Sequence, residues 1–174
     1  PPLAFDSDRL VGAAIGDSST RVFTDLQLDA QGFARFLFLD MTMSTTHAGR
    51  EVQRLLDIDM YRMMAMLAFP IARETAGELD QIERQLSSLA QRLETARPAD
   101  EPALLGEVTH LAAMIERLAG ESSFRFSAAR AYHALVRQRG TELREVRLPG
   151  VQTLTGFLDR RFGPAMAYCE SVAS

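Results

Sequence analysis

The sequence contains no lysine, no asparagine and no tryptophan, and it has a single cysteine, Cys169. All 19 basic residues are therefore arginines, a usage that we attribute to a GC-rich genome and not to function. One cysteine excludes an internal disulfide and a cysteine-rich metal site, and it favours a reducing compartment. We expect this thiol to belong to an inert, partly buried small residue.

The motifs of the common catalytic sites are absent too. Gly12, Gly16 and Gly32 are isolated, so the chain has no glycine-rich loop of the kind that holds phosphates. Glu107 and His110 have the spacing of half a di-iron carboxylate motif, but the second Glu-x-x-His half is missing. No apolar run approaches the roughly 20 residues that span a bilayer. From the missing catalytic and metal-binding motifs, we expect no enzyme activity, no catalytic residue, no cofactor and no metal in this chain.

What is present is typical of a globular protein, since 47% of the residues are hydrophobic and 24% are charged. The N-terminal part has the pattern of strands, expected at 10–15, 21–28 and 33–39, with turns at 16–19 and 29–32. Residues 33–39 are apolar on both sides except at Arg35, which predicts a central or doubly covered strand. These segments predict a short three-stranded antiparallel β-meander and, with the helices that follow, an α+β fold.

The remainder of the chain has a helical pattern, in which Pro70 is expected to kink the first helix. The segment 71–119 predicts a long antiparallel coiled-coil-like α-hairpin, because two heptad seams flank the proline-containing connection at 97–102. The seam residues are Leu79, Ile82, Leu86, Leu89 and Leu93 in the first arm, and Leu104, Val108, Leu111, Ile115 and Leu118 in the second.

Two further helices are expected at 123–147 and 151–174, after breaks at 120–123 and 148–150. The expected division of the chain is a β-meander at 1–43, as part of a larger α+β head, and a helical region at 44–174. Four methionines of the first helix are expected to pack as core under the sheet, with an adaptable interface as the alternative. They are Met60, Met63, Met64 and Met66.

Arginines are concentrated in the segment 125–161, which carries eight of them against three acidic residues, whereas residues 1–124 carry eleven against nineteen. Such a segment can contact anionic lipid or another anionic partner. The alternative is a solvated helix face with internal ion pairs. Tyr132 falls on the apolar stripe of its helix and is expected in the core, and we do not expect nucleic acid as a partner. The candidate patch consists of Arg125, Arg130, Arg137, Arg139, Arg144, Arg147, Arg160 and Arg161.

Short segments, spread in order over essentially the whole chain, carry a family resemblance. They include Arg21-Val-Phe-Thr-Asp, Gly32-Phe-Ala-Arg-Phe-Leu, Val52-Gln-Arg-Leu-Leu-Asp-Ile, Phe126-Ser-Ala-Ala-Arg-Ala-Tyr and Pro164-Ala-Met-Ala-x-Cys. They resemble the predicted membrane-anchored proteins of a domain-of-unknown-function family that is common in proteobacteria. The resemblance implies an α+β portion, these helices and a C-terminal hydrophobic anchor, so that both ends of the natural protein are expected outside this sequence. It supplies no catalytic residues.

We therefore expect a non-catalytic scaffold or interaction module of a membrane-anchored bacterial protein. Its α-hairpin is expected to bind a protein partner or a second copy, with the basic segment nearer the bilayer. The expected location is the inner membrane, with the soluble domain on the cytoplasmic side. Two alternatives stay open. One is the cytoplasmic domain of an ion-transport assembly, since the general plan is similar to CorA-type magnesium channels, and the other is an enzyme whose site needs a further N-terminal part.

Overall fold

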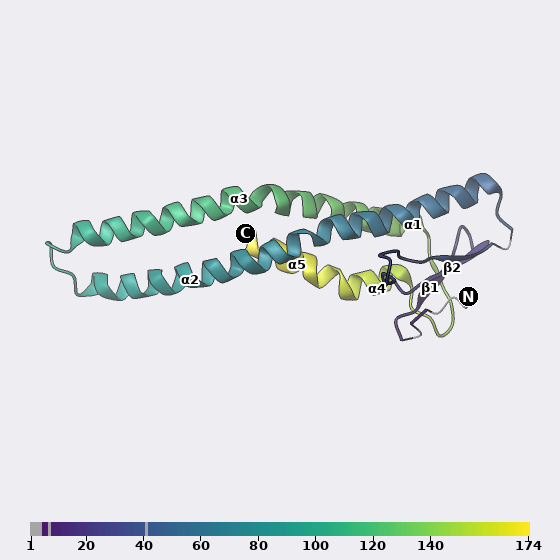
Figure 1. Cartoon of the computed structure of the whole chain (residues 1–174), viewed down its shortest axis with the longest axis horizontal. Coiled ribbons are helices and arrows are strands. Elements are labelled where there is room, and N and C mark those ends of the chain that lie inside the picture. Colours follow the sequence, from purple (N-terminus) through teal and green to yellow (C-terminus); the bar gives the residue numbers. More distant parts are fainter. Residues whose placement is uncertain (1–4, 7, 41) are drawn as a thin grey trace. The chain divides into compact units, whose positions relative to one another are not determined.

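The structure, a computed structural model, describes residues 5–6, 8–40 and 42–174. It is an α+β fold whose elements follow one another as β1 (Val11–Ile15), β2 (Thr20–Thr24), β3 (Leu37–Asp40), α1 (Thr45–Met66), α2 (Ala68–Glu94), α3 (Glu101–Glu142), β4 (Val146–Arg147), α4 (Leu154–Arg161) and α5 (Gly163–Val172) (Figure 1).

The chain forms two compact units. The first comprises Pro1–Met64 and Ala131–Ala165, and the second comprises Ala65–Arg130 and Met166–Ser174. The sheet therefore belongs to the first unit, and α2 with the part of α3 up to Arg130 belongs to the second. Residues 43 and 44 lie between the end of β3 and the start of α1. The domain boundary expected there stays a prediction.

The sheet has the strand order β3-β2-β1-β4, and every neighbouring pair is antiparallel. The expected three-stranded meander is thus confirmed. The fourth strand is an addition that the sequence did not indicate, because the segment around Val146 was assigned to a helix. Only Ala13 and Ala14 of β1 pair with this two-residue strand. So short a segment has no readable period, which is why its pattern was not recognised.

The assignment of residues 33–39 as the doubly covered central strand is wrong. The strand at this place is β3, which lies at the sheet edge, and Phe33 outside it is 66% exposed. The strand buried along its whole length is β1, with the sequence Val-Gly-Ala-Ala-Ile. Its small central residues let neighbouring chain segments approach closely, and the bulkier Val11 and Ile15 at its two ends are buried as well.

The second expected strand, 21–28, ends early at Thr24 because Leu26 has a left-handed backbone, with φ of 51°. The Thr24 hydroxyl stabilises this bend, donating to the Arg35 carbonyl at 2.7 Å and accepting from the Leu26 amide at 3.1 Å. A buried carboxylate, that of Asp25, accepts the Gln27 amide at 3.1 Å. These local hydrogen bonds replace the sheet ladder beyond Thr24.

The helical break expected at Pro70 occurs just before it, because α1 ends at Met66 and α2 begins at Ala68. Proline has no amide hydrogen to give to the carbonyl four residues earlier, so the ladder is interrupted at that turn. Leu67, between the two helices, keeps right-handed helical angles, with φ of −62° and ψ of −20°. The chain therefore resumes helix at once, as the sequence predicted.

The expectation of a break at residues 120–123 is wrong. The helix α3 is 42 residues long and runs through these positions without interruption. Gly120 costs a helix only about 1 kcal/mol, which tertiary packing offsets. Ser122 is buried, and its hydroxyl donates to the Leu118 carbonyl of the same helix at 2.7 Å. The helix ends at Glu142 and not at the expected residue 147. Arg144, two residues after this end, takes a left-handed backbone conformation with φ of 48°.

The last helical segment, expected at 151–174, begins close to the expected place but is divided at Phe162 into α4 and α5. Thr153 is the N-cap of α4, and its hydroxyl accepts the Gly156 amide at 3.2 Å. The Glu145 carboxylate accepts the amides of Leu154 at 2.9 Å and Thr155 at 3.0 Å. Two side chains thus satisfy the amides that a helix start leaves without partners.

We expect Glu145→Ala to lower the free energy of unfolding by about 1–3 kcal/mol, because it leaves two partly buried amides of α4 and the Thr155 hydroxyl without their acceptor. Urea denaturation followed by circular dichroism measures this loss. Glu170→Ala, which removes an exposed glutamate from α5, is the control. Equal stability of the two variants would contradict the capping role.

Candidate functional site

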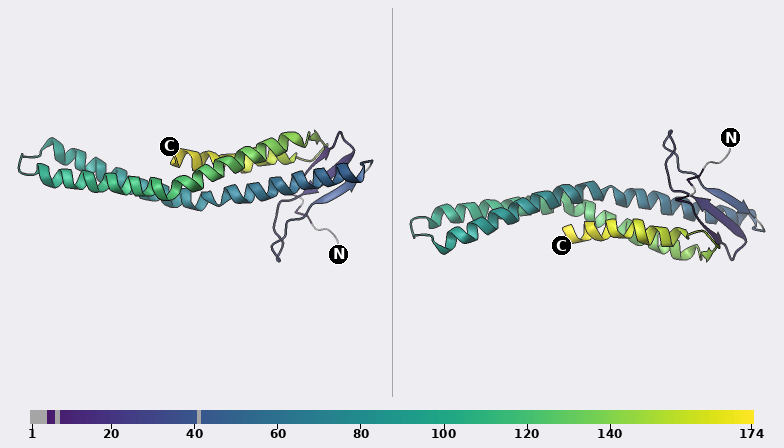
Figure 2. Two further views of the ribbon diagram at one scale, coloured as in Figure 1. Left: turned by 90° about the horizontal axis from the view of Figure 1, so that it is seen from above. Right: turned by 90° about the horizontal axis from the view of Figure 1, so that it is seen from below.

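The two arms of the hairpin, α2 and α3, lie side by side and antiparallel (Figure 1), and Figure 2 shows the same arrangement from two other directions. Their shared core is a cluster of Ile82, Leu111 and Leu118, with Leu79 and Met114 packed against it. The buried positions follow a spacing of seven residues, because only one of the two seam positions in each heptad faces the other arm directly. The α-hairpin expected from the heptad seams is therefore present.

The other seam position is exposed at four of its five residues, and the fifth, Leu79, is half-buried against the cluster. The residues of this position lie on one flank of the hairpin, because seven-residue spacing returns to the same side of a helix and antiparallel arms bring matching flanks together. We name this surface the hairpin apolar face. It consists of the seam residues Leu86 and Leu93 on α2 and Val108 and Ile115 on α3, together with Leu105, which is outside the seam but next to it, with exposed fractions from 37% to 67%.

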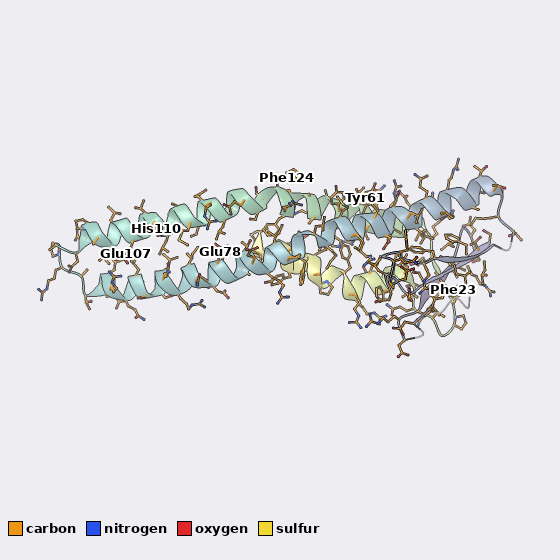
Figure 3. All side chains as sticks on the ribbon, in the orientation of Figure 1. Phe23, Tyr61, Glu78, Glu107, His110 and Phe124 are labelled. Carbon is orange, nitrogen blue, oxygen red and sulfur yellow. The ribbon has the colours of Figure 1, made fainter. Side chains whose placement is uncertain are left out.

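The opposite flank of the hairpin is polar and bridged by ion pairs. Arg92 of α2 donates to both carboxylate oxygens of Glu107 on α3, at 2.7 and 2.8 Å. Arg117 pairs with Glu78 at 3.2 Å and with Glu121 at 2.9 Å (Figure 3 labels Glu78 and Glu107). Exposed ion pairs of this kind add little stability, but they fix which flank of each arm meets the other.

A groove of about 450 Å³ lies on this polar flank, floored by Leu89 and Leu111 and edged by the pair of Arg92 and Glu107 together with His110. The hydrogen bond from Arg92 lowers the pKa of Glu107 from its ordinary value of 4.5, and Glu107 raises the pKa of Arg92. The pair is therefore ionised at neutral pH.

This pKa shift predicts an acid dependence of the hairpin. Because the pKa of Glu107 is lower in the folded than in the unfolded chain, its contribution is complete above 4.5 and is lost as the pH falls through the folded value. We expect the stability difference between the protein and Glu107→Gln to be constant near neutral pH and to shrink below pH 4.5. Thermal unfolding at a series of pH values measures it. A difference that stays constant down to strongly acidic pH would contradict the assignment.

The expectation that the methionines of α1 form core under the sheet is wrong for three of them. Met60, Met63 and Met64 are 51%, 44% and 42% exposed, and Leu56, one turn before Met60, is 54% exposed. The buried side of this helix is provided by Leu55 and other residues instead. Spacing alone did not distinguish the two faces of α1, since both carry apolar residues. The alternative, an adaptable interface of flexible methionine side chains, fits their exposure.

The structure does not bring the eight arginines of the candidate patch into one described cluster. Arg125 and Arg130 belong to the second unit, and the other six belong to the first. Two of those six have acidic partners. Arg139 pairs with Glu142 at 2.7 Å and lies 3.4 Å from Asp57, and Arg144 pairs with Asp17 at 3.0 Å. For these two, the alternative of internal ion pairs describes the structure.

Two other arginines of the patch, Arg147 of β4 and Arg160 of α4, line one groove of about 520 Å³ in the first unit. Gly150, Gln152 and Thr153 complete its polar wall. Among the residues that the structure describes, its lining contains these two arginines and no acidic side chain, which favours an anionic ligand. The remaining four patch residues are exposed, namely Arg125, Arg130, Arg137 and Arg161.

Two further expected features lie away from these surfaces. Tyr132 is half-buried and stacks on Tyr61, with ring centroids 5.8 Å apart, so it packs within the first unit without being fully buried. Cys169 is buried beside Phe126 and Met166, and burial raises the pKa of its thiol. Over residues 5–6, 8–40 and 42–174, no group of three or more His, Cys, Asp or Glu side chains could hold a metal ion. No helix of the described chain is both long and apolar enough to cross a membrane.

A family model described as "Protein of unknown function (DUF3422)" matches residues 2–174, nearly the whole chain. The chain belongs to the DUF3422 family. No curated protein and no solved structure matches it. The DUF3422 assignment agrees with the domain-of-unknown-function family that the segment resemblance indicated, and it supplies no ligand, partner or reaction. The proposals for this DUF3422 chain therefore depend on the surfaces described above.

Proposed function

We propose that this DUF3422 chain is a non-catalytic interaction module whose docking surface is the hairpin apolar face. The observation that carries the proposal is the exposure of four of the ten heptad-seam residues. Leu86 and Val108 repeat at Leu93 and Ile115, and all four are at least 37% exposed. A hairpin that has no partner needs polar residues at such positions, because contiguous exposed apolar surface favours association.

The regular repeat of this face supports a helical partner. Residues at seven-residue spacing on two antiparallel arms form an apolar row along each arm. Two such rows suit the apolar stripe of a third helix, by the packing that operates in helical bundles. The face therefore suits a protein partner better than a small molecule, which prefers an enclosed pocket.

Photo-cross-linking in the native cell tests this proposal. A photoreactive amino acid at Val108 should give a discrete protein adduct, and Leu86→Glu should abolish it by placing a charge in the docking surface. The matched control places the same photoreactive amino acid at Gln91, which is exposed on the outer side of α2. No adduct at Val108, or an equal pattern at both positions, would contradict the proposal.

We also propose that the protein is attached to the bacterial inner membrane, with this domain on the cytoplasmic side. The support is the family resemblance and the positive groove of Arg147 and Arg160, which suits anionic lipid headgroups. Fractionation of the natural protein with the membranes, combined with protease protection, tests both the attachment and the side.

The lipid part of this proposal makes a separate prediction. Arg147→Glu with Arg160→Glu should reduce binding of the domain to vesicles containing anionic lipid, since each basic residue near such a surface contributes about 1 kcal/mol. Co-sedimentation with the vesicles measures it. The control carries Arg73→Glu and Arg84→Glu, the same change in net charge at two exposed positions of α2. Equal losses in the two variants would mean that only net charge matters.

A further inference from the structure

From the charges around the hairpin apolar face, we propose that its partner is a basic amphipathic helix. This inference rests on the proposed function and adds the chemistry of the partner. The face is an apolar row edged by carboxylates on both arms. Glu83 and Glu94 flank Leu86 on α2, and Glu101 and Glu116 flank Val108 on α3, at separations of three, seven or eight residues that keep them on the same side of each helix.

These four glutamates differ from the glutamates of the polar flank. Glu78, Glu107 and Glu121 all pair with Arg92 or Arg117. In the part of the chain that the structure describes, Glu83, Glu94, Glu101 and Glu116 have no arginine within ion-pair distance, and all four are exposed. The arms thus satisfy their carboxylates on one flank and leave them available on the flank that carries the apolar row.

The chain itself shows that this side of the hairpin accepts a helix. The end of α5 lies at the base of the apolar face, where Val172 lines a groove of about 330 Å³ together with Leu79 of α2 and Ile115 of α3. Earlier in α5, Tyr168 contacts Phe69 of α2 edge to face, with ring centroids 5.7 Å apart. Beyond Ile115, towards the tip of the hairpin, the same row of side chains continues without this cover.

A second copy of this chain is a poor occupant. Pairing two apolar faces brings the acidic edges of both copies together, and like charges placed opposite each other oppose association. The whole segment 74–122 is acidic, with ten acidic residues against four arginines. A helix with Arg or Lys on both sides of its apolar stripe places opposite charges there instead.

The test uses the 174-residue chain and two labelled synthetic helical peptides with the same leucine stripe. One peptide carries Arg and Lys beside the stripe, and the other carries Glu and Asp. Fluorescence anisotropy at low and moderate salt should show binding of the basic peptide, weakened by salt. The variant Glu83→Arg with Glu116→Arg should weaken it about tenfold, whereas Glu74→Arg with Glu121→Arg, the same charge change at positions away from the face, should weaken it much less.

Each other outcome has a defined meaning. If neither peptide binds, the hairpin apolar face is not a helix-docking surface, and the proposed function fails with the inference. If both bind equally and Leu86→Glu abolishes binding, the docking surface stands and the basic partner is overturned. Light scattering on the chain alone tests whether a second copy occupies the face. A dimer that the substitution Leu86→Glu dissociates would identify the second copy as the occupant and overturn the basic helix.

Discussion

Leu111→Ala is expected to lower the free energy of unfolding of the hairpin unit by about 2–5 kcal/mol, the range for truncating a leucine inside a packed core. Leu111 is 4% exposed and packs with Ile82 and Leu118 in the cluster that joins the two arms. The substitution removes a buried isobutyl group from a contact made by only two helices, where few neighbours can move to fill the space. Urea denaturation followed by circular dichroism measures the change.

Leu105→Ala is the matched control, because it makes the same chemical change on the same helix at a position that is 67% exposed. We expect it to change the free energy of unfolding by at most about 0.5 kcal/mol, as is usual for surface positions. If instead the two variants lost equal stability, Leu105 would be buried in solution by association, and the loss would then depend on protein concentration.

Gly12→Ala is expected to destabilise the protein by about 1–3 kcal/mol through overpacking of the sheet. A Cβ atom at Gly12 would lie 2.5 Å from Cδ1 of Phe23 and 2.8 Å from the backbone oxygen of Val22. Phe23 is the residue directly opposite Gly12 on β2, and its ring occupies the space that the missing side chain leaves. The backbone oxygen cannot move without breaking the β1–β2 register. Thermal unfolding measures the loss.

Gly77→Ala should have the opposite sign. Gly77 lies inside α2, and a Cβ atom added there has no heavy atom within 4 Å. Alanine is favoured over glycine in a helix interior by about 1 kcal/mol, so the variant should be more stable. A gain from both substitutions would show that β2 shifts at little cost to make room for the methyl group that Gly12→Ala adds.

Much of the architecture could be predicted because it depends on local patterns. The hairpin followed from the spacing of Leu104, Leu111 and Leu118, and the first turn from glycine and small polar residues at 16–19. The errors concern features that depend on distant contacts. The burial of β1 depends on residues far along the chain that contact it, such as those of α4 and β4. Gly120 indicates a helix break by its low helix propensity, but the packing of α3 outweighs that cost.

The candidate surface was predictable only in part. Heptad spacing identifies Leu86 and Leu111 equally as seam residues, and only the structure shows that one is exposed and the other buried. The arginine-rich segment was visible in composition, but its partners were not, since Arg139 meets Asp57 from a helix more than 80 residues away. The acidic edge of the hairpin apolar face was already present in the sequence. Its relation to the apolar row follows only from the structure, which shows which flank of each arm is exposed and apolar.

The pairing of β1 with β4 has a consequence for the order of events during synthesis. The edge of β1 that β4 occupies stays open until residues 146–147 leave the ribosome, more than 130 residues after β1 itself. Within that interval, both arms of the hairpin emerge and can pair through local contacts, which form faster than distant ones. The first unit, which contains β1 and β4, therefore completes its folding after the hairpin, whose residues lie between the two segments of that unit in the sequence. During translation, the unpaired backbone of β1 is the part of the nascent protein that most needs protection from wrong strand pairing.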